Sequence, residues 1–216
     1  MKKGRFIVLE GGEGAGKGMC IEYLKERLLN GRGDMIFTRE PGGTPIAEKI
    51  RELLLSKDNN RMLPLTELFL FCGARAQHVN ELIKPALESG KNVICDRFEA
   101  STMAYQVYGR QRPEYVDVFN QLNNIAKAGL ELDAVILLEV AVTLGLNRKR
   151  KSRDGLCTRF DEEAIDFHRR VRAGFIEQYE LAEKSSKDWY FIDTTMMGES
   201  AVKERVFEIV KKILEE

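Results

Sequence analysis

The sequence predicts an α/β fold built on a parallel sheet, and three observations lead to this prediction. Short apolar runs of strand type alternate with segments of helical periodicity along the whole chain, which is typical of βαβ units whose sheet is covered on both faces. The length of 216 residues suits one such domain. A glycine-rich segment follows the first apolar run, at the place where folds of this class bind phosphate.

The predicted strands are apolar runs that end at glycine, acidic or turn residues. They cover residues 5–10, 35–38, 93–95, 134–138 and 189–192. The predicted helices carry apolar residues three and four positions apart. They cover 17–29, 45–55, 64–88, 114–128, 162–184 and 200–215, and another begins over 143–150. We expect a polar loop at 56–61, a basic loop at 151–160 and a single domain over 1–216, because no repeat or composition shift marks a boundary.

Charge and hydropathy exclude several classes of protein. Lysine plus arginine number 34 and aspartate plus glutamate number 34, so the formal net charge is zero. A non-specific nucleic-acid binder would carry a basic excess, and no run of 18 apolar residues predicts a membrane span. The apolar run Phe6 to Leu9 is too short for a signal-peptide core. The cysteines are interpreted as free thiols in a reducing cytoplasm, and they are Cys20, Cys72, Cys95 and Cys157.

The glycine-rich segment fits the phosphate-binding loop G-x-x-x-x-G-K. It consists of Gly11, Gly12, Glu13, Gly14, Ala15, Gly16, Lys17 and Gly18. Glycines let backbone N–H groups converge on phosphate oxygens, and the following helix N-terminus adds a favourable dipole. Lys17 would supply a positive charge to the β- and γ-phosphates of ATP. A plain strand-to-helix turn with a solvated lysine is the alternative, but the position between a predicted strand and a predicted helix favours a nucleotide site.

Gly18 departs from the motif, because serine or threonine usually follows the lysine and ligates Mg²⁺. One interpretation is a nucleotide binder with impaired turnover. The other is a site where Mg²⁺ is held by waters, the nucleotide and carboxylates, with Glu13 and Asp96 as the candidates. Adenylate kinases are similar to this chain in having glycine after the P-loop lysine. We favour the second interpretation.

Nearly the whole chain resembles the bacterial thymidylate kinases, and motifs beyond the P-loop carry the resemblance. They are Phe6-Ile7-Val8-Leu9-Glu10-Gly11, Thr38-Arg39-Glu40-Pro41-Gly42-Gly43-Thr44, Leu70-Phe71 with Arg75-Ala76-Gln77-His78, Asp96-Arg97-Phe98, Ser101-Thr102-Met103-Ala104-Tyr105-Gln106 and Thr158-Arg159-Phe160-Asp161. The order and spacing of these motifs are more specific than the P-loop. The resemblance implies a three-layer P-loop kinase fold with a lid at about 149–160.

Asp96 and Arg97 follow a predicted parallel strand, at the edge where open α/β sheets bind ligands. An arginine can hold a second phosphate through two hydrogen bonds, and the resemblance implies the 5′-phosphate of dTMP. It implies that Arg39, Glu40 and Arg51 surround the same phosphate, although Glu40 can instead be a plain turn residue. A structural pair of Asp96 with Arg97 is the alternative interpretation.

Phe71 and Arg75 lie four residues apart, on one face of a predicted helix. From the sequence alone Phe71 is rather a core residue, but the resemblance implies that Phe71 stacks on thymine and that Arg75 reads the base. It also implies that Ser101, Thr102 and Tyr105 lie at the base and sugar, with Tyr105 where a 2′-hydroxyl would sit. The alternative is an ordinary helix start with Ser101 as N-cap.

The basic run 148–153 lies where the resemblance implies a lid. A charge run is usually a solvated face, but arginines also stabilise a phosphoryl group during transfer. Gly14 stands where some relatives carry a basic residue, which implies that the lid supplies the catalytic arginine. Arg153 is the first candidate and Arg159 the second. The other expected catalytic residues are Lys17, Arg97 and Glu13.

The predicted function is in-line transfer of the γ-phosphoryl group of ATP to dTMP, giving ADP and dTDP in dTTP synthesis, with Mg²⁺ as cofactor. Positioning and charge neutralisation are expected to dominate catalysis. The alternatives are a kinase for another nucleoside monophosphate and a nucleotide-binding regulatory module that has lost turnover. The resemblance implies a homodimer, with helix 64–88 as a candidate contact. We expect no nucleic-acid or membrane partner.

Overall fold

The protein is described by a computed structural model over residues 3–29, 34–151, 158–185 and 188–215. Its centre is a five-stranded sheet in the order β2-β3-β1-β4-β5, in which every neighbouring pair is parallel. The strands are β1 (Phe6–Gly11), β2 (Met35–Arg39), β3 (Asn92–Asp96), β4 (Ala134–Glu139) and β5 (Trp189–Asp193). Each predicted apolar run forms one strand, so the prediction of a five-stranded parallel sheet is confirmed.

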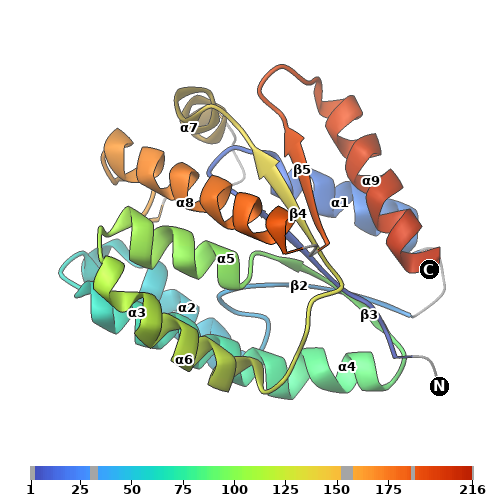
Figure 1. Ribbon diagram of the computed structural model, residues 1–216, viewed down its shortest axis with the longest axis horizontal. Helices are drawn as coiled ribbons and strands as arrows, with labels where there is room; N and C mark the ends of the chain where they lie inside the picture. The colour runs from blue at the N-terminus through green and yellow to red at the C-terminus, as the bar shows by residue number, and fades with distance from the viewer. Residues whose placement is uncertain (1–2, 30–33, 152–157, 186–187, 216) are drawn as a thin grey trace.

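Helices cover both faces of the sheet (Figure 1). One face is covered by α1 (Lys17–Leu28) and α9 (Glu199–Glu215). The opposite face is covered by η2 (Val79–Ile83), α4 (Lys84–Glu88) and α8 (Ile165–Lys184). The remaining helical segments are α2 (Pro45–Leu55), η1 (Lys57–Asn59), α3 (Pro64–His78), α5 (Glu99–Thr102), η3 (Met103–Gly109), η4 (Pro113–Tyr115), α6 (Val116–Lys127) and α7 (Val142–Lys151). This arrangement confirms the predicted three layers.

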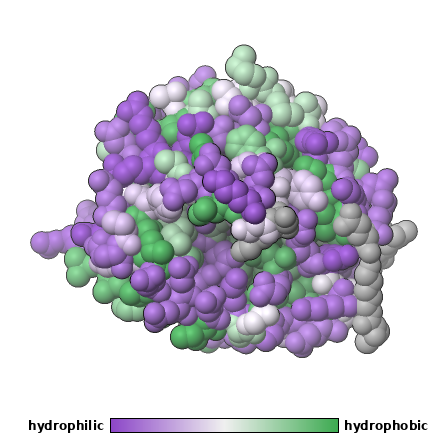
Figure 2. Space-filling view, in the orientation of Figure 1, coloured by the Kyte–Doolittle hydropathy of each residue, from purple (hydrophilic) through white to green (hydrophobic). Residues whose placement is uncertain are grey.

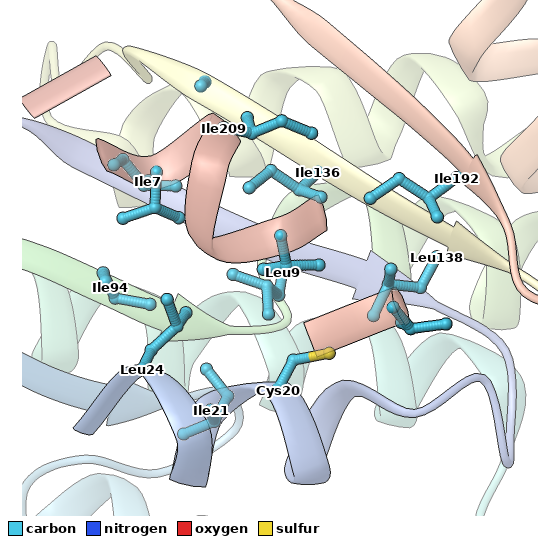
Figure 3. Close-up of a cluster of buried hydrophobic side chains, with 14 of the residues drawn as sticks. Ile7, Leu9, Cys20, Ile21, Leu24, Ile94, Ile136, Leu138, Ile192 and Ile209 are labelled. Carbon is cyan, nitrogen blue, oxygen red and sulfur yellow. The ribbon is translucent and has the colours of Figure 1, made fainter. Parts of the chain in front are cut away.

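Alternation of side chains along the strands divides the core between the two faces of the sheet. Ile7 and Leu9 of β1 pack with Leu24 of α1 and Ile209 of α9 (Figure 3). The alternate β1 residues Phe6 and Val8 pack against the other layer. Because β1 lies between β3 and β4 and is buried on both faces, it holds the P-loop that follows it at the centre of the molecule.

The predicted helix 64–88 is continuous but not uniform. It consists of α3, the π-helical segment η2 and the short helix α4. Pro85 lies in the first turn of α4, directly after η2. Proline has no N–H to continue the α-helical hydrogen bonds, and a wider turn before it is one way in which a helix adapts. The sequence prediction missed this change of helix type.

The segment 99–109 is helical, as α5 followed by the π-helical segment η3, and the element prediction did not include it. The suggested N-cap at Ser101 is wrong, because Phe98 occupies that position and Ser101 lies within α5. The carboxylate of Glu10, from the end of β1, accepts hydrogen bonds from the backbone N–H groups of Phe98 (2.8 Å) and Ser101 (3.1 Å). A strand residue far away in the sequence therefore caps this helix.

Hydrophilic side chains cover most of the face seen in Figure 2, with smaller hydrophobic groups between them. Within the described part of the chain, no helix combines the length and the apolar character that crossing a bilayer requires. The polar surface agrees with the high share of charged residues, 31% of the sequence.

Candidate active site

A cavity of about 1080 Å³ lies at the carboxyl ends of the strands, where parallel α/β sheets bind ligands. It brings together segments that follow each of the five strands. The predicted site residues that line it are Glu13, Gly14, Ala15, Gly16, Lys17, Gly18, Arg39, Glu40, Arg51, Phe71, Arg75, Asp96, Arg97, Ser101, Thr102 and Tyr105. Gly11 and Gly12 accept hydrogen bonds from Lys17 behind the loop.

Two P-loop glycines are required by close backbone contacts. Gly11 has a φ of +141°, and a Cβ there would lie 2.1 Å from the carbonyl oxygen of Leu138. Gly14 has a φ of +68°, and its Cβ would lie 2.0 Å from the carbonyl oxygen of Gly145 in α7. The backbones of the P-loop and α7 therefore touch, which leaves no room for a side chain at position 14.

Lys17 begins α1 and extends its side chain back along the loop. Its Nζ donates hydrogen bonds to the carbonyl oxygens of Gly11 (2.8 Å) and Gly12 (2.9 Å). Burial, followed by the positive charge of Arg97, lowers the pKa of Lys17 to about 8, against the opposing effect of nearby carboxylates. The ammonium group is thus held by neutral backbone atoms rather than by a direct ion pair.

Glu13 lies at the meeting point of the P-loop and the loop after β3. Its Oε1 accepts hydrogen bonds from Nη2 of Arg97 (3.0 Å) and from the hydroxyl of Tyr105 (2.8 Å). Burial alone would raise the pKa of Glu13, but the charges of Arg97 and Lys17 and the Tyr105 hydrogen bond outweigh it and hold the pKa at about 2. Glu13 is therefore a carboxylate at neutral pH.

Arg97 occupies a left-handed backbone conformation with a φ of +68°, which is rare for a residue with a side chain. The hydrogen bonds of Glu10 to Phe98 and to the Ser101 hydroxyl (2.5 Å) hold the chain on its carboxyl side. Nη1 of Arg97 donates to Ser101 Oγ (3.0 Å) and to the carbonyl of Gly11 (2.9 Å). Sequence reasoning missed this role of Glu10, although the residue stands inside the first quoted motif.

Asp96 is the one residue at the strand ends that presents a buried carboxylate oxygen without a protein partner, within the described residues. Its Oδ1 is the unpaired atom, and the residue lines the cavity. A Cβ at Gly18 would meet nothing within 4 Å, so the missing hydroxyl leaves open space. The described residues hold no cluster of three histidine, cysteine or carboxylate side chains that could bind a metal alone.

Arg39 and Arg51 form a basic edge of the cavity together with Arg97. Arg39 pairs with Glu48 (3.0 Å), and Nη1 of Arg51 donates to the carbonyl of Pro41 (2.7 Å). Burial, followed by repulsion from Arg39, lowers the pKa of Arg51, while Glu48 opposes this shift. All three arginines line the same cavity, and the charges of Arg39 and Arg97 act on Arg51. Such a concentration of positive charge suits an anion.

Arg75 lies at the other end of the cavity and is 1% exposed. Its guanidinium donates to Glu40 Oε2 (2.9 Å), to Asn123 Oδ1 (3.0 Å) and to Thr102 Oγ1 (2.8 Å). The second oxygen of Glu40 contacts Nδ1 of His78 at 3.1 Å. Glu40 is thus a buried ion-pair partner, and the alternative of a plain turn residue is wrong.

Aromatic side chains and a glutamine complete this end. Phe71 is half-buried, and its ring centre lies 6.2 Å from that of Phe160; Tyr105 meets Phe160 edge-on at 5.9 Å. Gln106 also lines the cavity; its amide nitrogen donates to Glu67, while its Oε1 has no partner. In the sequence Gln106 is only the last residue of the motif 101–106, and its unpaired oxygen becomes visible only in the fold.

The lid candidates have different positions. Arg148 and Lys149 of α7 line the cavity. Arg159 does not line it: the residue is 6% exposed and its Nη1 pairs with Glu67 at 2.5 Å. Arg153 lies outside the described residues. The cavity also has a wall after β5 that sequence reasoning missed, formed by Thr194, Met197, Gly198, Glu199 and Val202.

Comparisons with known proteins agree on one family. The family model described as thymidylate kinase matches residues 9–206. A thymidylate kinase of Desulfovibrio desulfuricans is 43% identical over 202 residues, which cover 91% of each chain. One of Geotalea uraniireducens is 41% identical over 215 residues, covering 98% of this chain and 97% of the relative.

A solved structure supports the same assignment. The crystal structure of thymidylate kinase from Ehrlichia chaffeensis superposes with a TM-score of 0.75 and 30% identity. The match covers 96% of this chain and 99% of the other. The fold, the P-loop cavity and the sequence similarity over nearly the whole chain lead to one conclusion: the chain belongs to the thymidylate kinase family.

Proposed function

We propose how this chain carries out the reaction of its family, the transfer of the γ-phosphoryl group of ATP to dTMP to give ADP and dTDP. One observation carries the proposal: a single cavity joins the P-loop to a cluster of arginines and, beyond it, to an aromatic pocket with polar groups. These three parts suit the donor phosphates, the acceptor phosphate and the acceptor base. In-line transfer needs both phosphates to be held close together.

The donor phosphates are assigned to the P-loop, residues 11–18. Backbone N–H groups at the N-terminus of α1 suit phosphate oxygens. Lys17 would exchange the carbonyls of Gly11 and Gly12 for the β- and γ-phosphates, because a phosphate anion attracts the ammonium more strongly than a neutral carbonyl does. The half-apolar wall after β5, with Met197 and Val202, suits the adenine ring.

The residues present fit Mg²⁺, although the site lacks the usual hydroxyl at position 18. Asp96 offers a buried carboxylate oxygen with no protein partner, and Mg²⁺ commonly takes one or two carboxylates plus phosphates and waters. Bound there, Mg²⁺ would neutralise charge on the transferring phosphoryl group. Glu13, whose Oε1 already accepts from Arg97 and Tyr105, is the second candidate.

The acceptor phosphate is assigned to Arg97, Arg39 and Arg51. Glu40 is the buried ion-pair partner of Arg75 and holds the base-binding part of the cavity in place. Arg97 reaches both the P-loop carbonyl of Gly11 and the acceptor side, so it can bridge the two phosphates. Its charge would stabilise the equatorial oxygens in the transition state. No side chain needs to act as general base, because the acceptor phosphate is already an anion.

The thymine ring is assigned to the pocket of Phe71, Arg75, Thr102 and Gln106. Thymine presents a donor at N3 and an acceptor at O4. The unpaired Oε1 of Gln106 suits the N3–H group, and the guanidinium of Arg75 suits O4. Phe71 offers an aromatic face for stacking. Ser101 and Tyr105 are assigned to the sugar side, where the Tyr105 ring would exclude a 2′-hydroxyl.

Lid closure over the phosphates is the remaining part of the proposal, with the lid at about 149–160 within a single domain of 1–216. Lys149 already lines the cavity, and its charge acts on Glu13. Arg153 remains the first candidate for the catalytic arginine. Arg159 would first have to leave Glu67, so it is the weaker candidate.

We further infer a homodimer in the cytoplasm. Apolar side chains remain exposed where α3 packs beside α6: Phe69 of α3 (49%), Ile125 of α6 (75%) and Leu63 (69%), which directly precedes α3. A second copy would bury them. The buried thiols of Cys20 and Cys72 agree with a reducing compartment.

A coupled assay of ADP release with ATP, Mg²⁺ and each of dTMP, dUMP, AMP, CMP and GMP tests the proposed function. We expect turnover with dTMP to exceed that with every other acceptor. A preference for another acceptor would assign a different substrate. Folded protein that binds ATP but turns over no acceptor would contradict the kinase and favour a binding module.

A further inference from the structure

We propose that Glu67 of α3 is a positioning residue for base selection: its carboxylate fixes the amide of Gln106 so that the carbonyl oxygen, and not the NH₂ group, faces the acceptor base. The inference rests on the proposed function, because it assigns a cause to the recognition of thymine. Glu67 itself does not line the cavity, so it acts through Gln106.

Glu67 is a buried carboxylate, 1% exposed, that receives donors on both oxygens. Its Oε1 accepts from Arg110 Nη2 (2.9 Å) and Arg159 Nη1 (2.5 Å). Its Oε2 accepts from Arg110 Nε (3.1 Å) and Gln106 Nε2 (3.2 Å). A carboxylate held between two guanidinium groups can only accept hydrogen bonds. Whatever faces its Oε2 must therefore be a donor.

The amide of Gln106 has two nearly isosteric orientations, related by a half-turn. In the observed one, Nε2 donates to Glu67 and Oε1 is buried, without a protein partner. The opposite orientation would bring Oε1 against the Oε2 of Glu67. Two acceptors would then face each other in a buried place, and the Glu67 hydrogen bond would be lost. Glu67 thus excludes the flipped amide.

The orientation decides which pyrimidine fits. Thymine carries N–H at N3 and can donate to the Oε1 of Gln106. Cytosine has an unprotonated N3 that needs a donor, which the flipped amide of Gln106 would supply and the observed orientation does not. A pocket whose buried polar atom stays unpaired with the wrong base discriminates more strongly than an apolar pocket does. Glu67 therefore favours dTMP over dCMP without touching either.

The test compares kcat/KM for dTMP and dCMP in Glu67→Gln with that in the wild-type protein. A glutamine at 67 can also donate, so it permits the flipped Gln106. We expect the dTMP preference to fall by about three- to tenfold, the size of one hydrogen bond, through a higher KM for dTMP and with the KM for ATP unchanged. Glu67→Asp keeps an acceptor-only group and should keep the preference.

Glu163→Gln is the matched control. Glu163 pairs with the same Arg110 at 2.5 Å but has no hydrogen bond to Gln106 among the described contacts. The same chemical change there should leave the preference unaltered. An unchanged preference in Glu67→Gln, or an equal loss in Glu67→Asp, would overturn the inference. Wild-type protein without dTMP turnover would instead contradict the proposed function itself.

A measurement on the wild-type protein covers the case in which Glu67→Gln does not fold. Hydrogen exchange of the Gln106 side-chain NH₂, followed by NMR, should be slow in the free protein, because this group faces buried Glu67. It should remain slow when dTMP binds. Fast exchange that slows only on dTMP binding would mean that NH₂ faces the cavity, and would overturn the inference.

Discussion

The P-loop end of the cavity, which we assign to the phosphates, and the Arg75 end, which we assign to the base, both hold buried charged side chains, but the partners of these charges differ. At the phosphate end, Lys17 rests on two neutral carbonyls and Asp96 keeps an unpaired oxygen. At the base end, Arg75 has three side-chain partners, and its partner Glu40 also contacts His78. The first set of partners is easily replaced by a ligand, whereas the second is a closed network.

Activity and stability therefore depend to different degrees on the charged residues at the two ends. A charge whose partners are weak gains most when a phosphate arrives, so it serves the reaction more than the fold. Removing one partner of a fully paired interior charge leaves the other partner buried and unpaired, which lowers the free energy of unfolding. Such a charge therefore also contributes to stability. Substitutions at the two ends should therefore separate kcat from the free energy of unfolding.

The largest effect is expected for Lys17→Met. Without the positive charge of Lys17 beside the transferring phosphates, kcat should fall by about 10³- to 10⁵-fold, the range seen for other phosphate-stabilising cations. The free energy of unfolding should not fall, because burial disfavours the charged lysine in the free protein. Steady-state kinetics and urea unfolding measure the two quantities. A clear loss of stability would break the proposed contrast.

The next effect is expected for Arg75→Met. Removing the guanidinium deprives the side chains of Glu40, Thr102 and Asn123 of their hydrogen-bond donor in the interior. This loss should lower the free energy of unfolding by about 3–5 kcal/mol. Arg39→Met is the control: Arg39 is half-exposed and pairs with Glu48 at the surface, so its loss should cost under about 1 kcal/mol while raising the KM for dTMP. Equal stability losses in the two variants would contradict a closed network.

The same residues differ in how well they could be predicted from the sequence. The P-loop and the Asp96-Arg97 turn were predictable because apolar runs and glycines mark the strand ends that carry them. The partners of Arg75 could not be predicted, because Glu40 and Asn123 lie 35 and 48 residues from Arg75 in the sequence. Pairing over such distances depends on packing, which no local pattern records. The π-helical segment η2 was missed because helical periodicity does not distinguish helix types, whereas α5 and η3 were not predicted as helix at all.

A smaller effect is expected for Gly18→Ser. The open space at position 18 admits the side chain, and serine is a better helix residue than glycine. The hydroxyl should strengthen Mg²⁺-dependent ATP binding by about three- to tenfold, the size of one added polar contact. Gly14→Ser is the control and should lose stability, because its Cβ would meet the backbone of Gly145. Weaker Mg²⁺-dependent binding in Gly18→Ser would argue against the proposed metal position.

The smallest effect is a proton taken up when ATP binds. With a pKa of about 8 in the free protein, Lys17 is only about one quarter protonated at pH 8.5. Nearby phosphates raise the pKa of Lys17, so binding at pH 8.5 should take up more than about half a proton, and binding at pH 7 much less from this group. Calorimetry in two buffers of different ionisation enthalpy measures the uptake. Lys17→Met should abolish it, and an unchanged uptake in that variant would assign the proton to another group.

The proposed contrast between Lys17 and Arg75 can be observed in a crystal structure of the wild-type protein with dTMP, Mg²⁺ and a non-hydrolysable ATP analogue. We expect Nζ of Lys17 to leave the carbonyls of Gly11 and Gly12 and to bind the phosphates. We also expect Arg75 to keep its ion pair with Glu40 while the Oε1 of Gln106 accepts a hydrogen bond from N3 of thymine. A Lys17 that stays on the two carbonyls, or an Arg75 that breaks from Glu40 to reach the ligand, would contradict the proposed contrast.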